Sequence, residues 1–250
     1  MNESIGALLE LSHEIGRREN KLAILGEGNT STKVNETSFA VKASGACLAN
    51  MGEADITVCD STMLIGLLDK KMPADEMVET VLMESRLKHS YRKPSVEAMF
   101  HAWLLTVQGV NFVGHCHPLN VNQVLCSPRA RDFAERRLFP DEVVCCGPSS
   151  VFVPYADPGL ALAREIRERT TDYIKINGFA PRLIVLQNHG IIAIGATANS
   201  VLACLLMAEK AGEIFVGAAS LGGPNFLPAK HVERIFVRPD EAYRQRQLKI

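Results

Sequence analysis

The spacing of apolar residues predicts helices along much of the chain. Between residues 4 and 19, apolar side chains recur on one helical face. Residues typical of helix starts support later segments, among them Pro94 and Pro158. Further helices are expected at residues 61–72, 73–90 (beginning at Pro73), 93–107, 119–127, 130–139, 157–175 and 197–221.

Shorter apolar runs predict strands between these helices. Two alternating runs flank residues 35–37 like the arms of a hairpin, and residues 182–195 hold two runs separated by residues 188–190. Further strands are expected at residues 55–60, 111–117 and 141–146. This irregular mixture predicts an α/β fold whose central mixed, largely antiparallel β-sheet is flanked by helices on both sides. Without repeats or linkers, residues 1–250 are expected to form a single domain.

Composition and charge argue against several classes of partner. The chain has 250 residues, of which 47% are apolar, and a formal net charge of -1. This balance gives no support for binding nucleic acid or a membrane surface. The N-terminus lacks the basic start and apolar block of a secretory signal, and the apolar run at residues 201–208 is too short to span a bilayer. We therefore expect a cytoplasmic protein.

The cysteines are expected to be core residues and not a metal or redox site. The chain has seven, none of them spaced as C-x-x-C, and a disulfide between the adjacent Cys145 and Cys146 would be strained. Free cysteine packs much like a small apolar residue. We expect all seven to be buried.

Two histidines close the apolar run in "NFVGHCHPLNVNQ" (111–123). On a strand, His115 and His117 project from the same face, with Cys116 directed the other way. Two imidazoles so placed can share a metal ion at about 2.0–2.1 Å each. His189, where Asn and Gly interrupt another apolar run, is a third candidate ligand. Each of these histidines also fits a structural role, bonded to nearby backbone.

Glu97 lies in the first turn of an expected apolar helix. An acidic residue there interacts favourably with the helix dipole, but the same carboxylate can also act as a general acid and base. His101 follows four residues later on the same helical face, where an internal hydrogen bond between the two side chains is expected. His101 and the histidines at positions 13, 89 and 231 are expected to be structural.

Two polar turns offer groups that can bind an anion. The segment "GEGNTS" (26–31) combines glycines with hydroxyl and amide side chains. The segment "KASG" (42–45) ends the next strand, with Lys42 and Ser44 on one face. Neither matches the glycine-rich motifs of nucleotide-binding proteins, and each alone is also typical of an ordinary turn.

Five motifs occur in an order that resembles the class II aldolase/adducin family, which includes the zinc-dependent sugar-phosphate aldolases. The motifs are "GEGNTS", "KASG", "KPSVEAMFH", "GHCHP" and "NHGIIAIG", and the resemblance runs over residues 26–218. It implies a single α/β domain in a homo-oligomer, commonly a cyclic tetramer with active sites between subunits. Tyr155 and Tyr243 are then candidates to assist across such an interface.

The resemblance also implies a role for each motif. His115, His117 and His189 match three ligands of zinc or another divalent transition metal, and Glu97 matches the catalytic acid/base. The residues Asn29, Ser31, Ser44, Gly45 and Ser95 match the loops that hold the substrate. Lys42 is a further substrate-binding candidate, because its charge can hold a phosphate or carboxylate. The implied activity is that of an aldolase-type carbon–carbon lyase of carbohydrate metabolism. Its substrate would be a small polyhydroxylated carbonyl compound, a sugar phosphate or sugar-acid derivative, cleaved through a zinc-stabilised enediolate.

The chain departs from the family pattern beside the glutamate. Sugar-phosphate aldolases tend to read Pro-Ser-Ser-Glu, whereas this chain has Val96 before Glu97, so a hydroxyl that would help to hold a phosphate is lost. The same scaffold also hosts decarboxylases, 4-epimerases and dehydratases, which shared metal ligands do not distinguish. A non-catalytic, adducin-like association module and a structural zinc protein are further alternatives.

Overall fold

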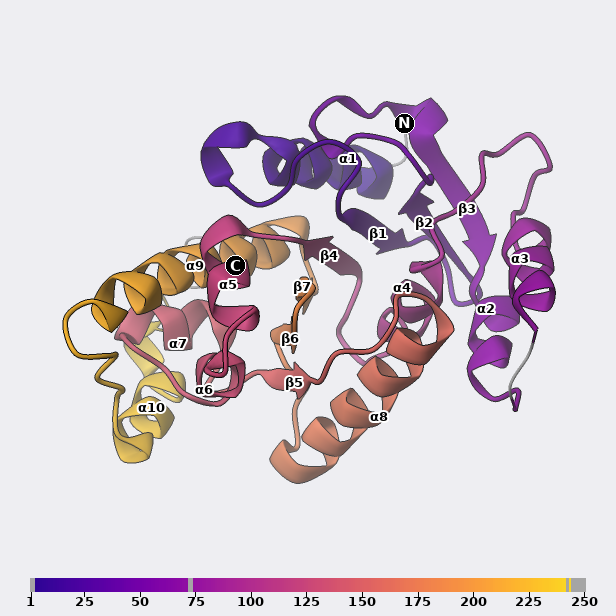
Figure 1. Ribbon diagram of the computed structural model, residues 1–250. Coiled ribbons are helices and arrows are strands. Elements are labelled where there is room, and N and C mark those ends of the chain that lie inside the picture. Colours follow the sequence, from indigo (N-terminus) through magenta and orange to yellow (C-terminus); the bar gives the residue numbers. More distant parts are fainter. Residues whose placement is uncertain (1–2, 72–73, 242, 244–250) are drawn as a thin grey trace.

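The computed structural model describes residues 3–71, 74–241 and 243, so that Pro73, the expected start of a helix, lies outside the described residues. The described residues form one seven-stranded sheet in the order β3-β2-β1-β4-β7-β6-β5 (Figure 1). The strands are β1 (Asn29–Lys33), β2 (Ser38–Lys42), β3 (Ile56–Asp60), β4 (Phe112–Cys116), β5 (Val151–Val153), β6 (Leu183–Leu186) and β7 (Gly190–Gly195). Neighbouring strands run antiparallel except β5 and β6, which confirms the predicted mixed, largely antiparallel sheet.

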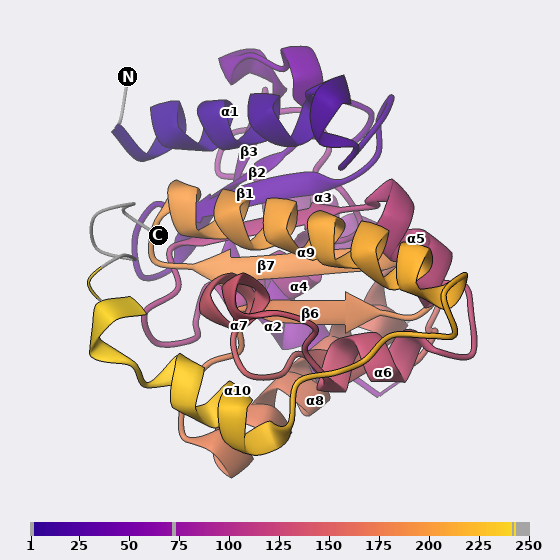
Figure 2. The same cartoon turned by 90° about the vertical axis from the view of Figure 1, so that its left-hand side faces the viewer.

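Helices cover both faces of the sheet, as predicted (Figures 1 and 2). One face carries α1 (Glu3–Gly16), α5 (Leu119–Leu125) and α9 (Ala198–Ala219), and the other carries α2 (Ser61–Leu68), α4 (Ala98–Leu104) and α8 (Leu160–Asn177). The remaining α-helices are α3 (Asp75–Glu84), α6 (Ala130–Glu135), α7 (Pro140–Cys146) and α10 (Ala229–Phe236). Short 3-10 helices span Arg18–Asn20, Leu48–Asn50 and Glu53–Asp55. Among these described helices, none is both long and apolar enough to cross a membrane.

The sheet separates two apolar cores because side chains alternate between its faces. In β4, Phe112 and Cys116 pack into the core beneath α1, α5 and α9, whereas Val113 packs into the core of α2, α4 and α8. His115 shares the face of Val113, and its ring meets Phe100 of α4 edge-on at 5.7 Å between centroids. The prediction that Cys116 points away from His115 is therefore confirmed.

The strand predicted at residues 141–146 is wrong, because this segment forms the helix α7. Pro140 stands at its first turn, followed by Asp141 and Glu142, and these are favourable residues for a helix start. A short apolar run alone does not distinguish a buried strand from a buried helix. The fifth strand of the sheet, β5, follows later in the chain.

Two further expectations need correction. Cys126 is exposed, and Cys47 and Cys145 are only half-buried, so the cysteines are not all core residues. The exposure of Cys126 follows from local geometry, because it is the residue that ends the short helix α5. The helix predicted at residues 93–107 begins only at Ala98, because Pro94 is held in extended conformation by a bridge to Ala43.

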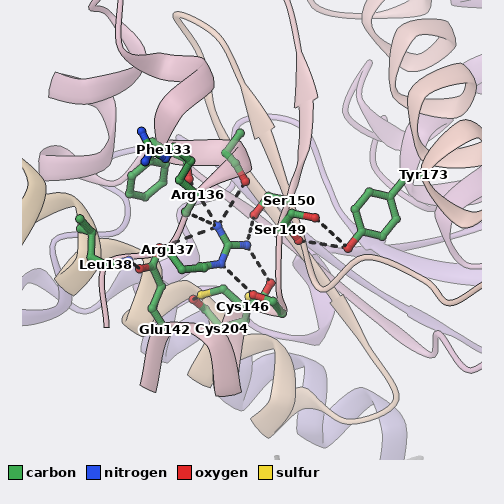
Figure 3. Close-up of polar contacts among 12 residues, drawn as sticks. Phe133, Arg136, Arg137, Leu138, Glu142, Cys146, Ser149, Ser150, Tyr173 and Cys204 are labelled. Carbon is green, nitrogen blue, oxygen red and sulfur yellow. Dashed lines mark hydrogen bonds and ion pairs between the residues drawn. The ribbon is translucent and has the colours of Figure 1, made fainter. Parts of the chain in front are cut away.

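A buried arginine ties together the segments around α6, α7 and β5 (Figure 3). The side chain of Arg137 is 1% exposed, and each of its guanidinium nitrogens donates hydrogen bonds. Nε donates to Gly147 O at 2.7 Å, and Nη2 donates to Ser150 Oγ at 2.8 Å. Nη1 donates to carbonyls of residues 133, 134 and 136 and lies 3.8 Å from Glu142 Oε1. We call Arg137, Glu142 and Ser150 the arginine cluster.

Candidate active site

Three histidines come together where β4 ends and where β6 turns into β7. His115 belongs to β4, His117 follows it, and His189 lies in the tight turn before β7. Their ring centroids are 4.9–5.0 Å apart in all three pairs. The ligand atoms of the three side chains lie within 4.8 Å of one another. The structure thus brings together the three histidines that the sequence predicted as ligands, and we call them the histidine cluster.

Two glycines permit this close approach. A Cβ at Gly190 would lie 2.4 Å from Cys116 O and 2.8 Å from a ring carbon of His117. Gly28, with φ +67°, lies so close to β4 that a Cβ would meet His115 O at 2.5 Å. Both positions therefore exclude any larger residue without a shift of the backbone that carries the ligands.

Helix α5 connects the two segments that carry the histidines. The Asn122 side chain donates to His189 O at 3.1 Å, and Asn188 N donates to Leu125 O at 3.2 Å. The carboxylate of Glu209, on α9, accepts from the backbone amides of residues 120 and 121 at the start of α5. This carboxylate stabilises free amides at a helix start, so the chain after His117 is held in place.

The hydrogen bonds of His115 fix which of its nitrogens is free to bind a metal. Nδ1 donates to the carbonyl of Ile191 at 2.9 Å, so Nε2 carries the lone pair of the neutral ring. That nitrogen lies 3.1 Å from His117 Nε2. Burial, reinforced by the neighbouring histidines, lowers the pKa of His115 to about 3 and that of His117 to about 4. Burial also lowers the pKa of His189.

The cluster fits a divalent metal ion. Neutral imidazole is the form that binds metals, and the lowered pKa values keep all three rings neutral near pH 7. Within the part of the chain that the structure describes, His189 Nδ1 is buried and has no hydrogen-bond partner. The other ring nitrogen, Nε2, lies 3.4 Å from Glu97 Oε1 at the cluster. Three imidazoles suit zinc and also accept cobalt, nickel or manganese, and they leave a coordination position for substrate.

Glu97 directs one carboxylate oxygen to the histidine cluster. It immediately precedes α4, and its side chain is 11% exposed. Oε1 lies 3.4 Å from His189 Nε2 and 3.6 Å from His115 Nε2. Oε2 accepts a hydrogen bond from Asn29 Nδ2 at 2.6 Å. The carboxylate predicted as acid/base therefore lies at the predicted ligands, with one oxygen bonded to Asn29.

The substrate-binding candidates of two loops also lie side by side. The bridge between Ala43 and Pro94 places "KASG" beside "KPSVE", and Ser44 N donates to Lys93 O at 2.8 Å. Ser44 and Gly45 are exposed at the end of this bridge. On the other loop, Ser95 is half-buried and its Oγ accepts from Glu97 N at 3.2 Å.

Lys42 lies beneath these loops and is 2% exposed. Its Nζ donates to Ala46 O at 2.7 Å and to Gly26 O at 3.1 Å, which joins "KASG" to "GEGNTS". Burial lowers the pKa of Lys42, although nearby negative groups such as Glu97 oppose this effect. Two of the three N–H groups of the ammonium are used in these bonds, and a role of Lys42 in binding an anion stays a prediction.

The sequence did not reveal the partners of His101. The bond expected between its side chain and that of Glu97 is not the one formed: Nε2 contacts Asn29 Oδ1, and Nδ1 lies 2.7 Å from Ser31 Oγ. A spacing of four along a helix suggested the local pair, whereas the actual partners come from β1, about 70 residues earlier. Glu27 was also missed; its Oε1 lies 4.0 Å from His117 Nδ1.

The two tyrosines proposed to act across an interface lie on the surface. Tyr155 follows β5, is 57% exposed and donates to Asp157 Oδ1 at 3.1 Å. Tyr243 is 58% exposed near the end of the described chain. Both side chains are accessible to another subunit, and their role stays a prediction.

Comparison with solved structures shows that this fold is shared by aldolases. The N-terminal class II aldolase domain of a conserved protein from Thermoplasma acidophilum matches with a TM-score of 0.68 and 23% identity, covering 86% of this chain and 95% of that chain. An L-fuculose 1-phosphate aldolase matches with a TM-score of 0.69 and 18% identity, covering 94% and 95%. A sugar-phosphate aldolase from Thermotoga maritima matches with a TM-score of 0.66 and 16% identity, covering 92% and 99%. At these identities the likeness shows the fold alone.

Comparison by sequence identifies the family. A search of curated proteins found no match. The family model described as "Class II Aldolase and Adducin N-terminal domain" matches residues 7–216, which include the histidine cluster, Glu97 and all the loops described above. The chain therefore belongs to the class II aldolase and adducin family.

Proposed function

We propose that the protein is a metal-dependent carbon–carbon lyase of the aldolase type, acting on a small polyhydroxylated carbonyl compound. The observation that carries this proposal is the convergence of the histidine cluster and Glu97, whose Oε1 lies 3.4 Å from His189 Nε2 and 3.6 Å from His115 Nε2. Three neutral imidazoles beside one carboxylate combine a metal site with a proton acceptor.

The roles of the side chains follow from their positions. His115, His117 and His189 would hold a divalent metal ion, which would act there as a Lewis acid on a substrate carbonyl and hydroxyl. Glu97 Oε1, at the edge of the cluster, removes the substrate proton or returns it. Oε2 is bonded to Asn29, so the carboxylate keeps one orientation during this transfer.

The adjoining loops are proposed to hold the anionic end of the substrate. Ser44, Gly45 and Ser95 lie on the two loops joined by the bridge of Ala43 and Pro94, next to Glu97. Val96, 40% exposed on the same loop, presents apolar surface where a second hydroxyl would help to bind phosphate. A sugar phosphate or a sugar-acid derivative is the proposed substrate class, with Lys42, Asn29 and Ser31 supporting these loops from beneath.

The proposal includes the assembly and location of the protein. We expect residues 1–250 to act as one domain in a cytoplasmic homo-oligomer, a tetramer, with each active site near a subunit interface. The exposed Tyr155 and Tyr243 are the candidates to reach a neighbouring site. Size-exclusion chromatography with light scattering tests this assembly.

A non-catalytic association module fits the molecule less well. Such a module has no need for three converging histidines or for a carboxylate beside them, since buried polar groups without a ligand are costly. The chain keeps all four side chains, and one ring nitrogen of His189 is buried without a partner among the described residues.

Metal analysis of the purified protein is the first test. We expect about one divalent ion per chain, since three imidazoles form a single catalytic site. His117→Ala should lose the ion, whereas His231→Ala, an exposed histidine of α10, should retain it as a matched control. A native protein free of metal, even after incubation with zinc, would overturn the proposal.

Turnover identifies the substrate and separates catalysis from a structural metal site. The screen covers sugar phosphates, sugar acids and their 3-oxo derivatives, with carbon–carbon cleavage, decarboxylation, epimerisation and dehydration all monitored. Glu97→Gln should retain the metal and lose turnover, because the amide cannot accept the substrate proton. Full activity in this variant would exclude Glu97 as the acid/base.

A further inference from the structure

Behind Glu97, four side chains are hydrogen-bonded in a row. Ser31 Oγ lies 2.7 Å from His101 Nδ1, His101 Nε2 contacts Asn29 Oδ1, and Asn29 Nδ2 lies 2.6 Å from Glu97 Oε2. Ser31 and His101 are fully buried, and Asn29 is 3% exposed. We call Ser31, His101 and Asn29 the relay.

The carboxylate of Glu97, to which the relay is bonded, fixes the direction of every hydrogen bond in the relay. An ionised carboxylate only accepts, so Asn29 must direct its NH₂ group to Glu97 and its carbonyl oxygen to His101. His101 Nε2 must then carry the proton, because it faces an acceptor. Burial lowers the pKa of His101 well below its usual value, so the ring is neutral and Nδ1 accepts from the hydroxyl of Ser31.

We infer that His101 is a positioning residue for Glu97, acting through Asn29. His101 holds the Asn29 amide in the orientation that makes Oε2 of Glu97 a permanent acceptor. Oε1 is thereby left as the oxygen directed to the histidine cluster. The inference rests on the proposed function in one respect, namely that Glu97 moves the proton.

The backbone arrangement explains why both Glu97 and His101 reach the Asn29 amide. Glu97 and His101 lie four residues apart at the start of α4, so both side chains reach the same neighbour on β1. That neighbour is Asn29, which pairs with His115 in the register of β1 and β4. The His101 ring is itself fixed by stacking on Phe100, with centroids 4.6 Å apart. The side-chain amide of Asn29 is therefore held both at its nitrogen, by Glu97, and at its oxygen, by His101.

Loss of the His101 donor would loosen the contact between Asn29 and Glu97. Without that donor, the Asn29 carbonyl oxygen would be buried without a partner, and only the bond to Glu97 Oε2 would hold the amide. The carboxylate would then lose its fixed orientation toward the histidine cluster. The histidine cluster would keep its own side-chain hydrogen bonds, because the His115 ring bonds to Ile191 O and lies beside His117, not to a side chain of the relay.

The tautomer of His101 tests the hydrogen-bond chain independently of any activity. Two-bond proton–nitrogen NMR spectra of the zinc-loaded protein, assigned with His101→Gln, report which ring nitrogen carries the proton. We expect Nε2 protonated and Nδ1 unprotonated at neutral pH. A ring protonated at Nδ1, or at both nitrogens, would overturn the inference while leaving the proposed lyase activity intact.

Kinetics tests the positioning role. His101→Leu should lower kcat by about 10–100-fold with the zinc content unchanged, as is usual for groups that orient an active-site residue. His101→Gln, which offers one donor and one acceptor, should recover part of this loss, and Ser31→Ala should give a smaller loss. His13→Gln, at an exposed histidine that bonds to Met51 O, is the control.

The outcomes are distinguishable. If His101→Leu and Ser31→Ala fold, bind zinc and keep the kcat of the control, the positioning role is wrong. If His101→Leu does not fold, Ser31→Ala and His101→Gln decide the same question. A wild-type protein without turnover of any compound in the screen would contradict the proposed function, whereas the NMR spectra would still decide the direction of the relay.

Discussion

The arginine cluster and the histidine cluster are both buried polar groups, but they are completed in different ways. Arg137 directs its N–H groups to carbonyl oxygens and to Ser150, so its hydrogen-bonding capacity is used within the fold. In the histidine cluster, two ring nitrogens face each other at 3.1 Å, and His189 Nδ1 has no described partner. A completed cluster stabilises a fold, whereas an incomplete one indicates a ligand.

Breaking the arginine cluster should have the largest effect on stability. Arg137→Leu removes the charge beside Glu142 and leaves several carbonyl groups buried without donors. Loss of one partner of a buried pair costs about 3–5 kcal/mol in the free energy of unfolding, measured by urea denaturation. Arg17→Leu, which breaks an exposed pair with Glu14, should cost at most about 1 kcal/mol. Equal losses of stability in the two variants would contradict a larger contribution from the buried Arg137 than from the exposed pair.

Adding a metal should stabilise the protein only through the histidine cluster. At a free zinc concentration 100 times the Kd, binding contributes about 2.7 kcal/mol and raises Tm. His189→Ala should abolish this increase, and Arg137→Lys, if folded, should retain it. The measurement is calorimetry of chelator-treated protein with and without zinc. A Tm increase that persists in His189→Ala would place the metal elsewhere.

Removing a histidine of the cluster should lower the free energy of unfolding of the metal-free protein only slightly. His117, partly exposed, contributes no hydrogen bond that another described group requires, apart from its contact with His115. We expect His117→Ala to change the free energy of unfolding of the apo protein by less than about 1 kcal/mol, as for a surface-accessible substitution. Loss of several kcal/mol would show that this cluster is structural, like that of Arg137.

The smallest expected effect concerns the pH dependence contributed by Glu209. Burial raises the pKa of this carboxyl, so the folded state retains its proton to higher pH than the unfolded state. Its contribution to stability is therefore largest at acidic pH and falls as pH rises from the unfolded pKa through the folded pKa. Glu209→Gln should flatten this part of the pH–stability curve relative to wild type. A steeper pH–stability curve in Glu209→Gln would show that the pKa of Glu209 is not raised by folding.

The sequence predicted which residues converge in the candidate active site better than it predicted the hydrogen-bond network behind them. Alternation along a strand, which is a local signal, placed His115 and His117 on one face. The order of the family motifs along the chain added His189 and Glu97. The relay could not be predicted, since His101 meets Ser31 and Asn29 only after β1 packs against α4. Partners so distant in sequence leave no periodic pattern.

The wrong strand has a local cause. Residues 141–146 include only four apolar residues, too few to show a period, and the helix-start residues Pro140, Asp141 and Glu142 favour the helix that forms. Lys42 illustrates the limit for a single side chain: its position at a strand end suggested contact with an anion, but tertiary structure places its ammonium between Gly26 and Ala46 carbonyls.

The loops joined by the bridge between Ala43 and Pro94 tolerate substitution differently from the segments around the histidine cluster. Gly28 and Gly190 leave no space for substitution near the histidine cluster, whereas Ser44 and Val96 are exposed on the bridged loops. If these loops hold the substrate as proposed, mutations at the exposed positions would change which substrate is accepted at little cost to the fold. New specificities would then evolve, or be engineered, one loop residue at a time around an unchanged histidine cluster.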